Sequence, residues 1–131
     1  MSLFVCKWKK EFDSTVKKGI REDICAGFAN LTGIDGKYFA VLFDDYVDED
    51  FPDGPIGVLV LIYQTEGRDI SFKEKEVAII TEAFCKYTGW DSSRISILIN
   101  DIQKGSMATK GKIVNLGGAA ACAIKNKELD I

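Results

Sequence analysis

The sequence predicts an α+β fold of two tandem β-α-β units, in which a four-stranded mixed sheet carries two helices on one face. Three observations predict it: an internal repeat at an offset of 56 residues, an amphipathic helical pattern in each repeat, and apolar segments on both sides of each helical pattern. The chain has 131 residues, of which 47% are hydrophobic. This length and composition favour a single domain, over residues 1–131, with a core of its own.

The repeat is the observation on which the fold prediction depends most. Residue n resembles residue n + 56 without a gap, so that pseudo-repeats cover about residues 2–46 and 58–112. A cluster of Phe, Thr, Gly and Asp is kept at the same spacing in both repeats, as Phe28, Thr32, Gly33 and Asp35 and as Phe84, Thr88, Gly89 and Asp91. Chance similarity would not stay in register over this length, so the two halves are expected to share one structure.

Each repeat contains two segments with the composition of a β-strand. The opening strands are expected at residues 3–8 and 58–63, which are rich in Val, Leu, Ile and aromatic residues. The closing strands are expected at 38–43 and 95–99. In a β-α-β unit the two strands lie parallel and the crossover through the helix is right-handed.

A helical pattern lies between the two strands of each repeat. Apolar residues recur there at spacings of three and four. We expect the first helix to begin near Asp13 or Ser14 and the second near Ser71, since these side chains cap helix N-termini. Gly33 and Gly89 are expected to end the helices.

Two further segments connect or follow the repeats. Residues 44–55 hold six carboxylates, two prolines and a glycine, and are predicted to form a solvated acidic linker. Residues 110–112, Lys-Gly-Lys, are expected to form an exposed hairpin turn. Residues 113–131, rich in small side chains, are predicted to add a short hairpin or helix and a tail.

The apolar strands indicate self-association. Residues 38–43 and 58–63 are apolar at odd and even positions alike, a pattern typical of strands that are covered on both faces. Two crossovers of one hand place both helices on the same face. The other face is therefore expected to meet further copies of the chain.

Composition excludes several classes of function. The net charge of −3 argues against nucleic-acid binding, and no apolar run reaches the length of a membrane span. The start of the chain lacks the apolar core of a signal peptide, and the four cysteines, Cys6, Cys25, Cys85 and Cys122, form no C-x-x-C motif. We therefore expect a cytoplasmic protein with free thiols. The sequence contains no histidine, so no Ser-His-Asp or Cys-His arrangement is possible, and we expect no metal and no cofactor.

Segments of the second repeat carry a family resemblance. They are residues 63–68, Tyr-Gln-Thr-Glu-Gly-Arg, then Lys73 at the opening of the helix, and residues 97–105, Ile-Leu-Ile-Asn-Asp-Ile-Gln-Lys-Gly. This pattern resembles the tautomerase superfamily, and the match to a 4-oxalocrotonate tautomerase subunit runs from about 58 to 112. Fused relatives, such as malonate semialdehyde decarboxylase and cis-3-chloroacrylic acid dehalogenase, hold two such units in one chain. The resemblance implies a homotrimer whose sheets face inward.

The resemblance also implies a catalytic group at the amino terminus. In the family, an amino-terminal proline exposed by removal of Met1 acts as base or acid on a small carboxylate-bearing keto or enol acid. This chain has Ser2 at that position. Three interpretations follow: the α-amine of Ser2, with a reference pKa of about 7.7–8.0, takes the role; the opening residues replace a different native start; or the protein has lost the chemistry.

Further site residues are implied by position. Arg68 lies where the family places a substrate-carboxylate arginine, and its planar fork suits a carboxylate. Met107 lies at the position of an active-site phenylalanine, and Asp35 lies near a functional aspartate of the decarboxylases. A packing methionine is an equally good interpretation of Met107, and a turn aspartate is the simpler interpretation of Asp35. Glu66 stands where the decarboxylases have an arginine, which weakens the case for decarboxylation.

The sequence thus leaves two main functions open. As an enzyme, the protein would act on a small anionic substrate with the Ser2 amine as acid or base and Arg68 as carboxylate anchor. As a non-enzyme, it would be a trimeric ligand-binding or structural relative, since the amino-terminal proline is absent. A small-molecule sensor with a similar sheet is a third class, and it would form a dimer.

Overall fold

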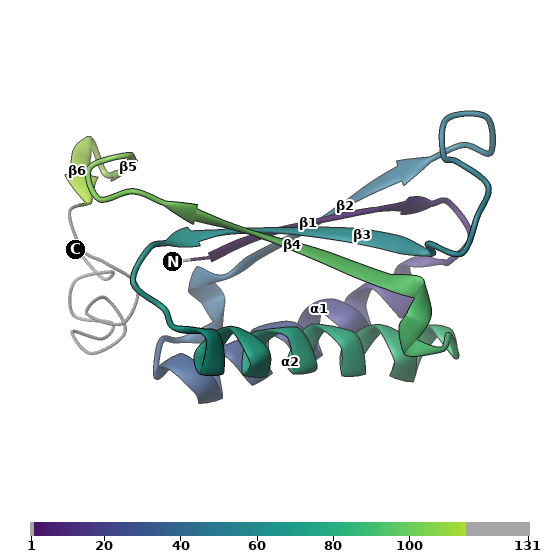
Figure 1. Ribbon diagram of the computed structural model, residues 1–131, viewed down its shortest axis with the longest axis horizontal. Helices are drawn as coiled ribbons and strands as arrows, with labels where there is room; N and C mark the ends of the chain where they lie inside the picture. Colours follow the sequence, from purple (N-terminus) through teal and green to yellow (C-terminus); the bar gives the residue numbers. More distant parts are fainter. Residues whose placement is uncertain (1, 115–131) are drawn as a thin grey trace.

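The protein folds as a four-stranded mixed sheet with two helices packed on one face, as the computed structural model in Figure 1 shows for the described residues 2–114. The elements of the sheet layer and the helix layer are β1 (Ser2–Lys9), α1 (Ser14–Thr32), β2 (Ala40–Tyr46), β3 (Val58–Thr65), α2 (Ile70–Thr88) and β4 (Ile95–Ile102). The strand order is β2-β1-β3-β4, with β1 parallel to β2, β3 parallel to β4, and β1 antiparallel to β3. The predicted α+β fold class is confirmed.

The closing strand of the first repeat begins and ends later than predicted. Residues Gly36–Tyr38 form a 3-10 turn, η1, and β2 continues to Tyr46. Asp44 and Asp45, expected in the linker, belong to the strand because both have partners on neighbouring elements. Lys7 Nζ lies 2.8 Å from Asp44 Oδ2, and Trp8 Nε1 donates to Asp45 Oδ1 at 2.8 Å.

Aspartates cap both helices. Asp13 Oδ1 accepts a hydrogen bond from Thr15 N at 3.0 Å, and Asp69 Oδ1 accepts one from Phe72 N at 2.8 Å. The second helix begins at Ile70, near the predicted start, but its cap is Asp69 and not Ser71. Both helices end as predicted, at Gly33 and Gly89, whose φ of 75° lies in the left-handed region that favours glycine.

The repeated Phe-Thr-Gly-Asp cluster is a helix-ending turn. In each repeat the threonine hydroxyl donates to the phenylalanine carbonyl and accepts from the backbone N–H two residues later, at distances of 2.6–3.1 Å. The aspartate then accepts from a backbone N–H of the following 3-10 turn, Lys37 N for Asp35 and Ser93 N for Asp91. Hydrogen bonds between these side chains and the backbone therefore account for the duplicated motif.

The hydrophobic core lies between the sheet and the helices. Side chains of β1 alternate between buried and half-buried, and the buried Phe4, Cys6 and Trp8 belong to one core cluster with residues of both helices. Phe4 packs edge-on against Phe28 of α1, with ring centroids 4.7 Å apart. Within residues 2–114, no helix covers the other face of the sheet (Figure 1), where Leu42 and Leu98 are 51% and 57% exposed.

A small hairpin follows β4. Strands β5 (Met107–Thr109) and β6 (Lys112–Val114) pair antiparallel, and Lys110 and Gly111 between them have φ of 52° and 75°. Two consecutive positive φ angles are typical of a tight hairpin turn, so the predicted turn is confirmed. The expected tail and Cys122 fall beyond residue 114, outside the described residues.

Two features are absent from residues 2–114. In this range no helix is long and apolar enough to cross a membrane. Nor does this range contain a group of three or more Cys, Asp or Glu residues placed to hold a metal ion.

Candidate functional site

The structure brings Ser2 and Arg68 together at the end of the sheet where β1 begins and β3 ends (Figure 1). Ser2 is the first residue of β1 and is paired with Gln64 of β3 in the antiparallel register. Arg68 Nη1 donates to Ser2 Oγ at 3.4 Å, although 66 residues separate them in the chain. Two of the predicted site residues are therefore neighbours.

Arg68 owes its position to the loop between β3 and α2. Gly67 has a φ of 109°, which side chains rarely allow, and this turn directs the chain from the end of the strand back toward the helix. The guanidinium carbon of Arg68 lies 5.0 Å from the centre of the Phe72 ring, which covers one face of the group. The loop and the first turn of α2 thus hold the guanidinium against the sheet.

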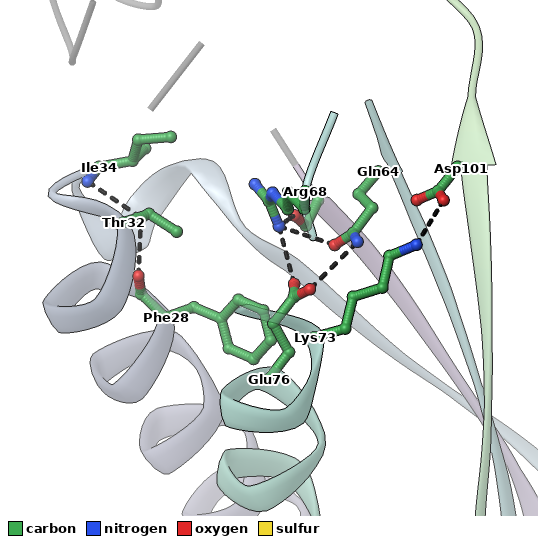
Figure 2. Close-up of polar contacts among 9 residues, drawn as sticks. Phe28, Thr32, Ile34, Gln64, Arg68, Lys73, Glu76 and Asp101 are labelled. Carbon is green, nitrogen blue, oxygen red and sulfur yellow. Dashed lines mark hydrogen bonds and ion pairs between the residues drawn. The ribbon is translucent and has the colours of Figure 1, made fainter. Parts of the chain in front are cut away.

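Arg68 forms a buried ion pair with Glu76 of α2. Its Nη1 atom lies 2.7 Å from Glu76 Oε2 and 2.7 Å from Gln64 Oε1 (Figure 2). Gln64 Nε2 in turn donates to Glu76 Oε1 at 3.1 Å, so that the three side chains close a ring of hydrogen bonds. We call Gln64, Arg68 and Glu76 the polar triad.

The polar triad lies almost entirely out of contact with solvent. The Arg68 and Glu76 side chains are 1% and 0% exposed, and Gln64 and Ser2 are also buried. Burial raises the pKa of Glu76, while the charge of Arg68 and the hydrogen bond from Gln64 offset part of this effect. Arg68 was predicted from the sequence, whereas Gln64 and Glu76 were not. The signal that could have revealed Glu76 is that a glutamate occupies an inward-facing position of the helical pattern.

The repeat shows that the fold itself does not require these polar residues. At the equivalent positions, 56 residues earlier, the first repeat has Trp8, Phe12 and Ile20 in place of the polar triad. Trp8 and Ile20 are fully buried, and the Trp8 and Phe12 rings stack with centroids 5.3 Å apart. The same backbone position is thus filled by apolar packing at one end of the sheet and by an ion pair at the other.

Other charged groups at the Ser2 end are also partnered. Lys73 Nζ lies 2.6 Å from Asp101 Oδ2, next to the triad in Figure 2, and Glu66 Oε1 accepts from Lys104 N at 3.3 Å. The Lys73–Asp101 pair is repeated at the other end of the sheet as Lys17 and Asp45. These two pairs tie each helix to an edge strand and are features of the fold.

The two remaining predicted site residues stand in different settings. Asp35 is exposed and accepts from Lys37 N at 3.0 Å, the same contact that Asp91 makes in the second repeat. Met107 is half-buried in β5 of the hairpin, opposite Val114. Their roles in substrate binding stay predictions.

Comparison with known proteins agrees with this arrangement. Residues 59–116 match the family model described as "Tautomerase enzyme". The second repeat of the chain is therefore similar to the tautomerase family. No curated protein has a sequence significantly similar to the chain.

Several solved structures share the fold over most of the chain. A fused 4-OT forming an asymmetric trimer has a TM-score of 0.77 at 13% identity, covering 85% of this chain and 94% of its own. A fused 4-OT in a symmetric trimer gives 0.74 at 16% identity, with 90% and 97% covered. Malonate semialdehyde decarboxylase gives 0.66 at 11% identity, with 84% and 92% covered. These likenesses establish the shared fold.

The polar triad makes a prediction about stability. Replacing Arg68 by Phe or Glu76 by Ile, the residues of the first repeat, leaves one buried charge without its partner and is expected to lower the free energy of unfolding by about 3–5 kcal/mol. The double variant Arg68→Phe/Glu76→Ile restores an apolar pair and is expected to lose far less, giving a coupling energy of at least ~2 kcal/mol in urea denaturation. The partly exposed pair Lys73–Asp101 is the control, with an expected coupling below ~1 kcal/mol. Additive effects of the Arg68 and Glu76 substitutions would contradict the ion pair.

Proposed function

We propose that the protein catalyses proton transfer on a small keto or enol acid, with the α-amine of Ser2 as acid and base and Arg68 as the carboxylate anchor. The observation that carries the proposal is the 3.4 Å contact between Ser2 and Arg68 at one end of the sheet. The match of residues 59–116 to the tautomerase family model supports it, since this is the chemistry that the family resemblance implies.

The chemistry needs only a base near neutral pH and a cation beside it. In the ketonisation of an enol acid, the amine accepts the proton of the enol hydroxyl, and the ammonium so formed delivers a proton to the neighbouring carbon as the double-bond electrons shift and the carbonyl forms. An α-amine with a pKa near 7.7–8.0 is suited to both steps at physiological pH. Arg68 holds the substrate carboxylate through parallel hydrogen bonds, which fixes the reacting carbon beside the amine.

Two conditions follow from the geometry. Met1 must be removed for the amine of Ser2 to be free. Because Ser2 and Arg68 are 1% and 5% exposed, this end of the molecule must also open for a substrate to reach them. The proposal therefore includes an opening step before binding.

A second candidate function is a non-catalytic, ligand-binding or structural relative. The observation that favours it is the buried ion pair, because Glu76 already neutralises the cation that would hold the substrate. The serine in place of the amino-terminal proline favours it as well. The two candidates differ in whether turnover depends on the amine and on Arg68.

We further propose that three copies associate through the uncovered sheet face. That face carries the exposed Leu42 and Leu98, and two of the structural relatives are described as trimers. Apolar side chains on an open sheet are stabilised when copies cover them.

The proposed assembly predicts a trimer in sedimentation velocity. Leu98→Lys places a charge on the uncovered sheet face and is expected to shift the protein to monomers or smaller species. The matched control is Val77→Lys, which adds the same charge on the partly exposed surface of α2 and is expected to leave the trimer intact. A wild-type monomer would contradict the assembly, and a dimer would favour the sensor class.

The proposed activity is tested by ketonisation of phenylenolpyruvate and of 2-hydroxymuconate, after mass spectrometry has established the amino-terminal residue. We expect Arg68→Ala and chemical blocking of the terminal amine each to lower kcat/KM by about 100-fold or more. The double variant Arg68→Phe/Glu76→Ile keeps the core packed but lacks the anchor, and is expected to be equally impaired. Lys17→Met, at the other end of the sheet, is the control. Rates unchanged by loss of both groups would establish the non-catalytic alternative.

A further inference from the structure

We propose that Glu76 sets the charge of the site, so that it accepts ligands with a single carboxylate and discriminates against dicarboxylates. The inference deepens the proposed function, because it names the substrate class of the same site and assumes that a ligand binds beside Arg68. It rests on the charges that the structure places around Ser2.

The first step is the charge balance of the polar triad. Arg68 contributes one positive charge and Glu76 one negative charge at 2.7 Å, and both are buried. A ligand carboxylate at Arg68 therefore meets a neutral pair with hydrogen-bond donors, where a lone arginine would present a full positive charge. In a buried site with a low dielectric constant this difference is much larger than in water.

The second step is the balance of the neighbouring charges. Lys73 is paired with Asp101 at 2.6 Å, so this pair adds no net charge. Glu66, which stands in the same loop as Arg68 and accepts from Lys104 N, adds a negative charge. Arg68 and Lys73 are each paired with a carboxylate, so a second ligand carboxylate would meet repulsion from Glu66 and Glu76.

The third step is that the buried glutamate occurs in the second repeat and not at the equivalent position of the first. The equivalent residue of the first repeat, Ile20, is fully buried in the core, so an apolar side chain satisfies the packing at this position. A buried glutamate costs desolvation that the fold does not require. A role in setting the charge of the site accounts for the residue.

The test compares two ligands of the same shape and different charge. Sorbate and trans,trans-muconate share a six-carbon diene, and sorbate has a methyl group where muconate has its second carboxylate. In isothermal titration calorimetry with the wild-type protein, we expect sorbate to bind at least about tenfold more tightly than muconate. Equal or tighter binding of muconate, or no binding of either ligand, would overturn the inference.

Variants locate the cause of the preference. Glu76→Gln keeps a hydrogen-bonding side chain but removes the negative charge, and is expected to shift the ratio of the two dissociation constants toward muconate by about tenfold. The matched control is Glu22→Gln, which changes the net charge equally on an exposed turn of α1 and is expected to leave the ratio unchanged. If Glu76→Gln does not fold, Gln64→Glu, which adds a carboxylate beside Arg68, is expected to weaken muconate binding more than sorbate binding.

Failure of the inference and failure of the proposed activity are distinguishable because binding and turnover are measured separately. Selective sorbate binding without ketonisation leaves the charge selectivity standing and removes the enzymatic proposal. Ketonisation together with a preference for muconate removes the charge selectivity and leaves the enzyme.

Discussion

Arg68 can be buried beneath the first turn of α2 only because Glu76 and Gln64 are buried with it. An isolated guanidinium without solvent would cost far more free energy than a small domain can supply. The closed ring of hydrogen bonds, with distances of 2.7–3.1 Å, satisfies both charges and fixes the direction of the arginine. The position of the guanidinium beside Ser2, and hence the proposed site, depends on this ion pair.

The duplicated fold shows what the ion pair replaces. Both repeats use the same caps, the same helix-ending turn and the same lysine–aspartate pair between helix and edge strand. They differ in the residues that fill the two ends of the core: one end holds the aromatic stack of Trp8 and Phe12, and the other holds the polar triad. The same backbone fold thus accommodates apolar packing at one end of the core and a buried ion pair at the other.

Much of this fold was predictable from the sequence because it follows from local patterns and from the repeat. Helix ends at Gly33 and Gly89 and the hairpin turn at residues 110–112 depend on backbone angles that only a few residue types favour. Less predictable were the elements whose limits depend on distant partners. Asp44 and Asp45 have the composition of a linker, yet contacts with Lys7 and Trp8 keep them in β2.

The candidate site was predictable only in part for the same reason. Arg68 was found from its family position, but Glu76 lies eight residues further along the chain and Ser2 lies 66 residues before Arg68. Their proximity arises from the antiparallel pairing of β1 with β3 and from the face that α2 turns to the sheet. No spacing in the sequence predicts contacts of this kind. A buried glutamate can be recognised only when the position of its counter-ion in the structure is known.

Nitrogen-15 NMR of the arginine side chains measures the buried ion pair most directly. The account predicts that the guanidinium protons of Arg68 exchange with water far more slowly than those of the exposed Arg21, and that Glu76→Gln removes part of this protection. Guanidinium protons of Arg68 that exchange as fast as those of Arg21 would contradict a buried pair and, with it, the proposed basis of the site.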